Sequence, residues 1–185
     1  MSFDIIPVWQ QVTPELKAEL VAFWDRNKAL GGRVSAEDRA AQAVCIGRDE
    51  AGTLCAVGTA AVRVLPRLRQ PTYYYRQFFD ASQRGQRQTV PFVTRVREVL
   101  QAHNAAMQTP ESLGLLVELE NRMLGQRYTG VREAAGFTFI GYSPRGLPMF
   151  VSWFDDAKLL PPAPLPRGTA APSRQHGPSN TGIPA

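Results

Sequence analysis

Two periodicities of hydrophobic and polar residues alternate along the chain, and together they predict a mixed order of strands and helices. Alternation with period two, or a short continuous apolar run, predicts a strand, whereas apolar residues three and four apart predict a helix. Strands are predicted over residues 3–9, 43–47, 53–65, 72–79, 113–120, 137–142 and 149–154. Helices are predicted over residues 14–30, 89–104 and 128–135, with a shorter one opening at 35–38. No internal repeat is present in this order.

Helix starts and turns carry residues that favour them locally. Thr13 is a good N-cap, and Pro14 suits the first turn of the helix that follows. Thr89 and Pro91 suggest the same arrangement, a cap and a first-turn proline, at the start of the helix over 89–104. Asp, Glu, Ala and Gly at 49–52 predict the turn of a hairpin between the two strands beside it.

The composition divides the chain into one domain and a tail. Of the 185 residues, 44% are hydrophobic and 20% are charged, which is typical of a globular protein and allows a real core. We expect this domain to span residues 1–158. Residues 159–185 are rich in proline and small polar residues and cannot bury enough apolar surface to offset their ordering entropy. We therefore expect a disordered tail there.

Several classes of protein are disfavoured by the sequence. No apolar run approaches the roughly 18 residues that cross a bilayer, and the first residues do not resemble a secretory signal. We therefore expect a cytoplasmic protein with no membrane partner. Two cysteines and two histidines are too few for a disulfide framework or a histidine-based metal centre, so no metal is expected. No Gly-x-Ser-x-Gly motif of a serine hydrolase is present.

The charge is modest and almost entirely arginine on its positive side. The formal net charge is +5, and all but three of the basic residues are arginines. Arginine suits phosphate recognition through its planar guanidinium, but it also accumulates in some genomes through codon bias. No run of four basic residues occurs, so nucleic-acid binding is not expected.

The junction between residues 79 and 92 is the most informative stretch for function. A predicted strand runs into Arg84, Gly85, Gln86, Arg87, Gln88 and Thr89, and a helix begins at once. A helix N-terminus carries partial positive charge and unpaired N–H groups, which suits a bound phosphate. Arg84 and Arg87 would add charge-assisted hydrogen bonds. The alternative is an ordinary polar turn with solvated arginines.

This junction resembles a known loop. Arg84-Gly85-Gln86 is similar to the start of the Arg-Gly-x-Gly-x-Gly/Ala loop of the GCN5-related N-acetyltransferase (GNAT) superfamily, whose amides hold the pyrophosphate of acetyl-CoA. Phe79 and Phe92 occupy flanking positions that are apolar in that family. Residues 131–137, Val-Arg-Glu-Ala-Ala-Gly-Phe, resemble its Leu-Tyr-x-x-x-Gly-Phe motif. The order of elements is also similar, and the resemblance covers about residues 3–155.

The resemblance implies a fold, an activity and a cofactor site. The fold would be α+β, an acyl-CoA N-acyltransferase fold with a central mixed, mostly antiparallel sheet flanked by helices. The activity would be transfer of an acetyl group from acetyl-CoA to an unidentified amine, and nothing in the sequence indicates a homodimer. The residues implied to bind acetyl-CoA are Phe79, Arg84, Gly85, Gln86, Arg87, Gln88 and Thr89.

The same resemblance implies catalytic groups. Glu118 and Glu120 are two apart on a predicted strand and so share a face, where they could act as base for the amine. Two carboxylates on one face tend to raise one pKa, although both could simply mark the solvated end of the strand. Tyr128 would protonate the leaving thiolate, because Arg132, one predicted helical turn later, replaces the tyrosine of many members; its alternative role is packing. Tyr73 and Tyr75 share a face, where they could line an acceptor pocket or, as we expect, pack on a helix.

The departures from the family pattern define a second hypothesis. Arg87 and Thr89 stand where the family has glycine, or glycine or alanine, and Arg132 replaces a catalytic tyrosine. The chain could therefore be a non-catalytic binding or scaffold protein of this fold that has lost the usual CoA loop. The position of the Arg87 guanidinium discriminates between the two hypotheses, since it would fill the anion site in the second.

Overall fold

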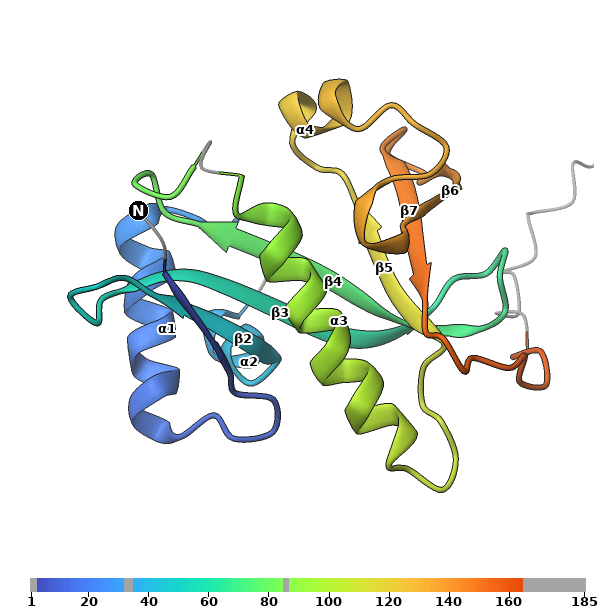
Figure 1. Cartoon of the computed structure of the whole chain (residues 1–185), viewed down its shortest axis with the longest axis horizontal. Helices are drawn as coiled ribbons and strands as arrows, with labels where there is room; N and C mark the ends of the chain where they lie inside the picture. Colours follow the sequence, from blue (N-terminus) through green and yellow to red (C-terminus); the bar gives the residue numbers. More distant parts are fainter. Residues whose placement is uncertain (1–2, 32–34, 85–86, 165–185) are drawn as a thin grey trace, which may run out of the picture.

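The computed structural model describes residues 3–31, 35–84 and 87–164, which form one mixed sheet with helices on both faces (Figure 1). The seven strands lie in the order β1-β2-β3-β4-β5-β7-β6. Their bounds are Asp4–Pro7 (β1), Ala43–Arg48 (β2), Leu54–Val64 (β3), Pro71–Phe79 (β4), Gly114–Glu118 (β5), Thr138–Tyr142 (β6) and Pro148–Trp153 (β7). The helices are Pro14–Asn27 (α1), Ala36–Ala40 (α2), Thr89–Ala105 (α3) and Arg122–Arg127 (α4), with a 3-10 turn η1 at Ala134–Gly136.

One junction divides the sheet. β4 and β5 are parallel neighbours, while the other neighbouring strands are antiparallel. Their ladder consists of Tyr73 beside Leu115 and Tyr74 beside Leu116. Beyond these pairs β4 continues to Phe79 and β5 to Glu118 without pairing with each other, and Figure 1 shows the two strands running apart. The sheet therefore opens between its two halves.

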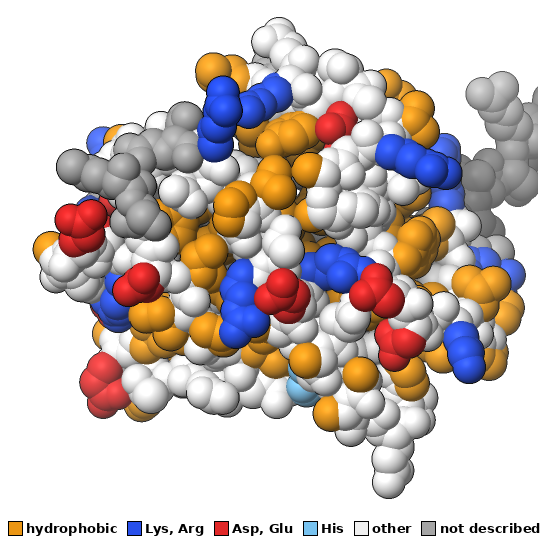
Figure 2. All heavy atoms as spheres, viewed as in Figure 1, with side chains coloured by type: hydrophobic (Ala, Val, Ile, Leu, Met, Phe, Trp, Pro, Cys, Tyr) orange, Lys and Arg blue, Asp and Glu red, His pale blue; other side chains and the backbone are white. Residues whose placement is uncertain are grey.

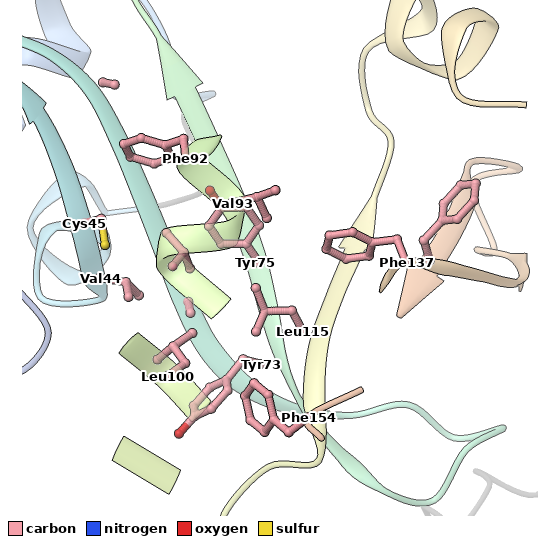
Figure 3. Close-up of a cluster of buried hydrophobic side chains, with 14 of the residues drawn as sticks. Val44, Cys45, Tyr73, Tyr75, Phe92, Val93, Leu100, Leu115, Phe137 and Phe154 are labelled. Atoms are coloured by element: carbon pink, nitrogen blue, oxygen red, sulfur yellow. The ribbon is translucent and has the colours of Figure 1, made fainter. Parts of the chain in front are cut away.

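The alternation of side chains along β4 assigns residues to the two faces. Tyr73 and Tyr75 belong to the buried cluster on the α3 face, together with Phe92 and Leu100 of the helix (Figure 3). Phe78 packs instead into the second cluster, which contains buried residues of α1 and α2. This confirms the expectation that Tyr73 and Tyr75 pack on a helix. The period of two thus sends Tyr73 and Tyr75 to the α3 face, and Tyr74, Arg76 and Phe78 to the face that α1 and α2 cover.

Two glycines allow close approach within this core. A Cβ at Gly58 of β3 would lie 2.9 Å from the Phe92 ring and 3.0 Å from that of Tyr75, so the glycine lets α3 approach the sheet. A Cβ at Gly114 would collide with the backbone oxygen of Ser152 and lie 2.8 Å from the Cα of Trp153. Gly114 therefore allows β5 and β7 to come together where β5 begins.

The helix predicted over 128–135 is wrong. The side chain of Asn121 accepts a hydrogen bond from the Met123 amide at 2.9 Å and caps α4, which ends at Arg127. Residues 131–133 run beside β6 instead, with Phe139 N–H bonded to the Val131 carbonyl and Glu133 N–H to the Phe137 carbonyl. Strand pairing therefore overrides the helix-favouring composition of this stretch.

The first residues of the proline-rich segment are held by hydrogen bonds. The Gln70 side chain bonds the backbone N–H and carbonyl of Leu160, and Arg69 bonds the backbone of Ala163. Residues 165–185, most of the predicted tail, lie outside the described residues. Both cysteines are free and buried. No helix in the described ranges is long and apolar enough to cross a membrane.

We predict that Gly114→Ala destabilises the protein by about 2–4 kcal/mol, because its methyl group meets backbone atoms that cannot rotate away. Gly125→Ala is the matched control, since a Cβ there meets nothing within 4 Å and the residue lies in α4. It should be neutral or stabilise by up to about 1 kcal/mol. Urea unfolding of both variants tests this, and equal midpoints would contradict it.

Candidate functional site

The N-terminus of α3 lies beside the end of β4, but its cap differs from the prediction. Gln88, and not Thr89, is the N-cap residue, and its side chain makes no capping hydrogen bond. Thr89 is the first residue of the helix, and Pro91 carries no N–H. The first turn of this long helix therefore presents amide groups and partial positive charge without a side-chain cap.

The two arginines of the loop before α3 have different surroundings. The Arg84 Nε donates to the Phe79 carbonyl at 3.2 Å, and its guanidinium lies 5.3 Å from the centroid of the Phe78 ring. Arg87 is exposed and has a φ of 58°. An exposed side chain does not fill a buried anion site, and the left-handed backbone is the conformation that glycine favours. Gly85 and Gln86 lie outside the described residues.

Phe79 has a structural role at this junction. Its ring lies 5.3 Å from that of Phe92, at the start of α3, and 6.0 Å from that of Phe3. These contacts join the end of β4 to the first turn of the helix. Aromatic packing therefore holds the helix N-terminus against the end of β4.

A cluster of charged residues lies on the opposite face of the sheet, where β4 and β5 separate. We call it the carboxylate–arginine cluster; it consists of Arg39, Tyr74, Arg76, Glu118, Glu120 and Arg145. Tyr74 belongs to the last residue pair between the strands. Arg76 and Glu118 are the next residues on that face of each strand. The cluster therefore flanks the start of the opening.

Glu118 is the most enclosed carboxylate of this cluster. Its side chain is 8% exposed, and it accepts hydrogen bonds from the Tyr74 hydroxyl at 2.7 Å and from Nη2 and Nε of Arg145 at 2.7 and 3.2 Å. Glu120 is 49% exposed and accepts from the same Arg145 Nη2 at 2.8 Å. The shared partner brings the two carboxylates together, but β5 ends at Glu118 and the Glu120 N–H bonds the Glu118 carbonyl in a turn, so the pair does not lie on one strand as the spacing predicts.

The electrostatics of Glu118 differ from the prediction. Burial raises the pKa of the Glu118 carboxyl, but hydrogen bonds from Arg145, Ser143 and Tyr74 lower it further than burial raises it, so the pKa is below its ordinary value. The expectation of a raised pKa is therefore wrong here, because a cation lies between the carboxylates. Burial, followed by the bond to Glu118, raises the pKa of Tyr74, which keeps its hydroxyl a donor.

Sequence reasoning missed four members of the cluster. Tyr74 is identifiable in retrospect, since alternation along β4 sends it to the face opposite Tyr73 and Tyr75. Arg145 lies in the loop between β6 and β7, and only the pairing of β7 with β5 brings it to Glu118. Arg39 and Arg76 come from elements that the sequence predicts but does not place together.

The other predicted catalytic residue lies elsewhere. Tyr128 follows the end of α4, is half-buried, and has the Arg127 guanidinium 5.9 Å from its ring centroid. Arg132 pairs with Thr138 in an isolated bridge. Tyr128 and Arg132 are therefore not one helical turn apart, and a structural equivalence between them does not follow.

The surface around α3 has charges of both signs. Figure 2 shows basic and acidic side chains interspersed over this face, with hydrophobic side chains between them. Within the described parts of the chain, no three His, Cys, Asp or Glu side chains form a group that could hold a metal ion.

Solved structures share this fold. No protein-family model and no curated protein matches the chain. The putative acetyltransferase yncA of Salmonella typhimurium, solved with its cofactor acetyl-CoA, matches with a TM-score of 0.55 at 14% identity, over 87% of this chain and 99% of that one. A GNAT-superfamily phosphinothricin acetyltransferase of Sinorhizobium meliloti, in complex with acetyl-CoA, matches with a TM-score of 0.54 at 12% identity, over 88% of this chain and 94% of that one. The structure of AtaTR bound with acetyl-CoA matches with a TM-score of 0.52 at 16% identity, over 82% of this chain and 94% of that one. The chain therefore has the fold of GNAT acetyltransferases, which confirms the predicted fold class.

We predict that Glu118→Gln lowers the free energy of unfolding by about 1.5–3 kcal/mol at pH 7, since it removes charge-assisted hydrogen bonds to Arg145. The pKa of Glu118 is lowered in the folded state. Its contribution is therefore complete above the ordinary glutamate pKa of about 4.3 and is lost as the pH falls through the folded value. Urea unfolding should show the wild-type advantage narrowing below that pH.

Glu50→Gln is the control for this prediction, because Glu50 is exposed in the turn between β2 and β3. It should change the free energy of unfolding by less than about 0.5 kcal/mol both at pH 7 and at pH 3. A wild-type advantage over Glu118→Gln that is as large at pH 3 as at pH 7 would contradict the proposed ion pair.

Proposed function

We propose that the protein is an acetyl-CoA-dependent N-acetyltransferase that acts on an amine. The observation that carries this proposal is the start of α3, which has no side-chain cap and is joined by aromatic packing to the end of β4, the strand that separates from β5. An uncapped helix N-terminus suits a phosphate group, and the open sheet beside it leaves strand edges for an extended ligand. Similar structures with acetyl-CoA support the assignment.

The residues of the loop fit the pyrophosphate of acetyl-CoA. Arg87 adopts the left-handed backbone that glycine would give, and its exposed guanidinium is free of the core. Its substitution for glycine is therefore compatible with a retained anion site. We propose that the amides of residues 85–89, with the Arg84 and Arg87 side chains, bind the phosphates, while Phe79 positions the loop. Gln88 and Thr89 contribute backbone N–H groups.

Acetyl-CoA would supply the acetyl group as a thioester, whose carbon–sulfur bond breaks as the carbon–nitrogen bond forms. The acceptor must first lose a proton. Glu120 is the better proton acceptor of the pair, because half of its side chain is exposed and Arg145 bonds it through one atom. Glu118 is enclosed by Tyr74 and Arg145, so we assign it to holding Arg145 beside Glu120.

We keep Tyr128 as the proposed acid that protonates the thiolate. It is half-buried and stands at the end of α4, in the half of the sheet that begins with β5. A phenol is a suitable proton donor to a thiolate. The other tyrosine that follows β5 in the chain is Tyr142, which is 60% exposed.

The alternative is a non-catalytic binding protein of the same fold. The observation that favours it is the hydrogen bonding of both carboxylates to Arg145, which leaves neither of them free of a cation. Such a protein would bind acetyl-CoA without turnover, or would not bind it at all.

We predict that acetyl-CoA at about 100 times its dissociation constant stabilises the protein by roughly 2.7 kcal/mol. This corresponds to an increase in Tm of about 5–11 °C for a domain of this size. Desulfo-CoA should act similarly and ATP should not. A folded protein whose Tm does not respond to either CoA compound would overturn the proposed function.

Arg87→Glu should weaken acetyl-CoA binding about tenfold or more, because it replaces a cation near the phosphates with an anion. Arg63→Glu is the matched control, since Arg63 is also an exposed arginine but lies on β3 opposite Thr72, at the far end of β4. Titration by calorimetry compares the two. Equal losses would show that only the net charge of the protein matters.

We further predict that Tyr128→Phe lowers kcat about 100-fold while leaving the affinity for acetyl-CoA unchanged, as loss of a general acid would. Thiol release from acetyl-CoA, with an acceptor found by screening amines, measures this. Tyr142→Phe is the control, because Tyr142 is 60% exposed on β6. A Tyr128→Phe variant with wild-type kcat would reduce Tyr128 to a packing residue.

A further inference from the structure

The guanidinium of Arg76, at the start of the opening between β4 and β5, lacks close acidic partners. Its Nε is buried and has no hydrogen-bond partner among the described residues. Its Nη2 lies 3.8 Å from Glu120 Oε1, beyond hydrogen-bond distance, and its guanidinium lies 4.7 Å from the Tyr74 ring centroid. A buried N–H of a charged group without a partner costs free energy. The Arg76 side chain as a whole is 35% exposed, so a ligand would reach the guanidinium through its Nη groups and not through the buried Nε.

A second cation stands close to it. Arg39 of α2 donates its Nε to the Thr59 hydroxyl at 3.2 Å, and Thr59 lies opposite Arg76 in the β3–β4 ladder. Burial, followed by the positive charge of Arg76, lowers the pKa of Arg39 to about 10. The two guanidinium groups therefore repel each other at a distance where an anion between or beside them would relieve the repulsion.

The charges of the carboxylate–arginine cluster do not balance. Three arginines face two glutamates, and Arg145 takes up both carboxylates through hydrogen bonds. Arg76 keeps the remote contact to Glu120 and its contacts with the neutral Tyr74 side chain, and the Arg39 Nε bonds a neutral hydroxyl. One negative charge is missing, and it is missing on the Arg76 side of the cluster.

The position of this excess charge connects it to the proposed reaction. Arg76 and Glu118 follow directly after the Tyr74–Leu116 pair, on the face of the sheet opposite α3. Under the proposed function the acetyl group arrives at the opening between these strands, so the acceptor approaches over this cluster. Glu120 lies between Arg76 and Arg145, next to the place where an anion bound by Arg76 would carry an amine.

Resting on the proposed function, we infer that the acceptor is a small amine that also carries a carboxylate, such as an α-amino acid, and that Arg76 binds this carboxylate with Arg39 as the second cation. A planar carboxylate can accept from the two Nη groups of one guanidinium, and it supplies the single charge that the cluster lacks. The α-amine of such an acceptor would then lie near Glu120, the proposed proton acceptor.

The test compares acids with their own amides. Thiol release from acetyl-CoA is measured with each of the twenty common L-amino acids and with the corresponding amino-acid amides, which keep the amine and the side chain but lack the carboxylate. Because the amides hold the less basic amine, they are easier to deprotonate, and a preference for the acids must come from binding. We expect kcat/KM to be at least about tenfold higher for the preferred acid than for its amide.

Variants of Arg76 connect this preference to the site. Arg76→Gln should lower kcat/KM for the preferred acid about tenfold or more, leave the amide unchanged and retain the increase in Tm with acetyl-CoA. Arg76→Lys should recover part of the loss, since it restores the charge without the planar pair of donors. Arg63→Gln, which removes an exposed arginine of β3, should leave kcat/KM unchanged for both the acid and the amide.

The outcomes separate the two proposals. A wild-type protein whose Tm does not respond to acetyl-CoA overturns the proposed function. An intact response with equal turnover of acids and amides, or with turnover of neither set, overturns the acceptor assignment alone. An acid preference that survives Arg76→Gln shows that another group binds the carboxylate and overturns the role of Arg76.

Discussion

The short ladder between β4 and β5 is the constraint on which the rest of the site depends. Parallel pairing ends at Tyr74 and Leu116, after two residue pairs, although both strands continue. On the edges where β4 and β5 face each other, the backbone N–H and C=O groups beyond that point have no partner strand, and such groups need other partners. The N-terminus of α3 stands on one side of this opening and the carboxylate–arginine cluster on the other, so both parts of the proposed reaction meet there.

Side-chain contacts hold the opening where the backbone ladder stops. The Tyr74 hydroxyl of β4 bonds Glu118 of β5, and Arg145 joins Glu118 to the loop between β6 and β7. A buried carboxylate is stable only with such partners, so the pairing ties the second half of the sheet to the first. On the opposite face, Phe79 and Phe92 fix the start of α3. The site is therefore framed by packing that does not depend on a ligand.

Local features could be predicted from the sequence, and features that depend on strand pairing could not. Periodicity placed most strands and α3 correctly, and the period of two assigned Tyr73 and Tyr75 to the core. The helix expected over 128–135 failed because residues 131–133 pair with residues at the start of β6. The raised pKa expected for one glutamate failed because Arg145, 27 residues further on, lies between the two carboxylates. The charge balance of a site depends on such non-local partners, whereas spacing reports only neighbours.

The departures from the family's loop weigh less than the sequence suggests. The αL backbone of Arg87 costs roughly 1–2 kcal/mol relative to glycine, so a non-glycine residue there is tolerated when the surrounding structure favours that conformation. The arginine then adds a cation at the rim of a helix terminus that is already suited to anions. On the other face of the sheet, Arg76 and Arg39 likewise place cations where an anion could bind. Under the proposed function both ends of the opening thus carry unbalanced positive charge, and the ligands that fit it best carry anions at each end: a pyrophosphate beside α3 and a carboxylate beside Arg76.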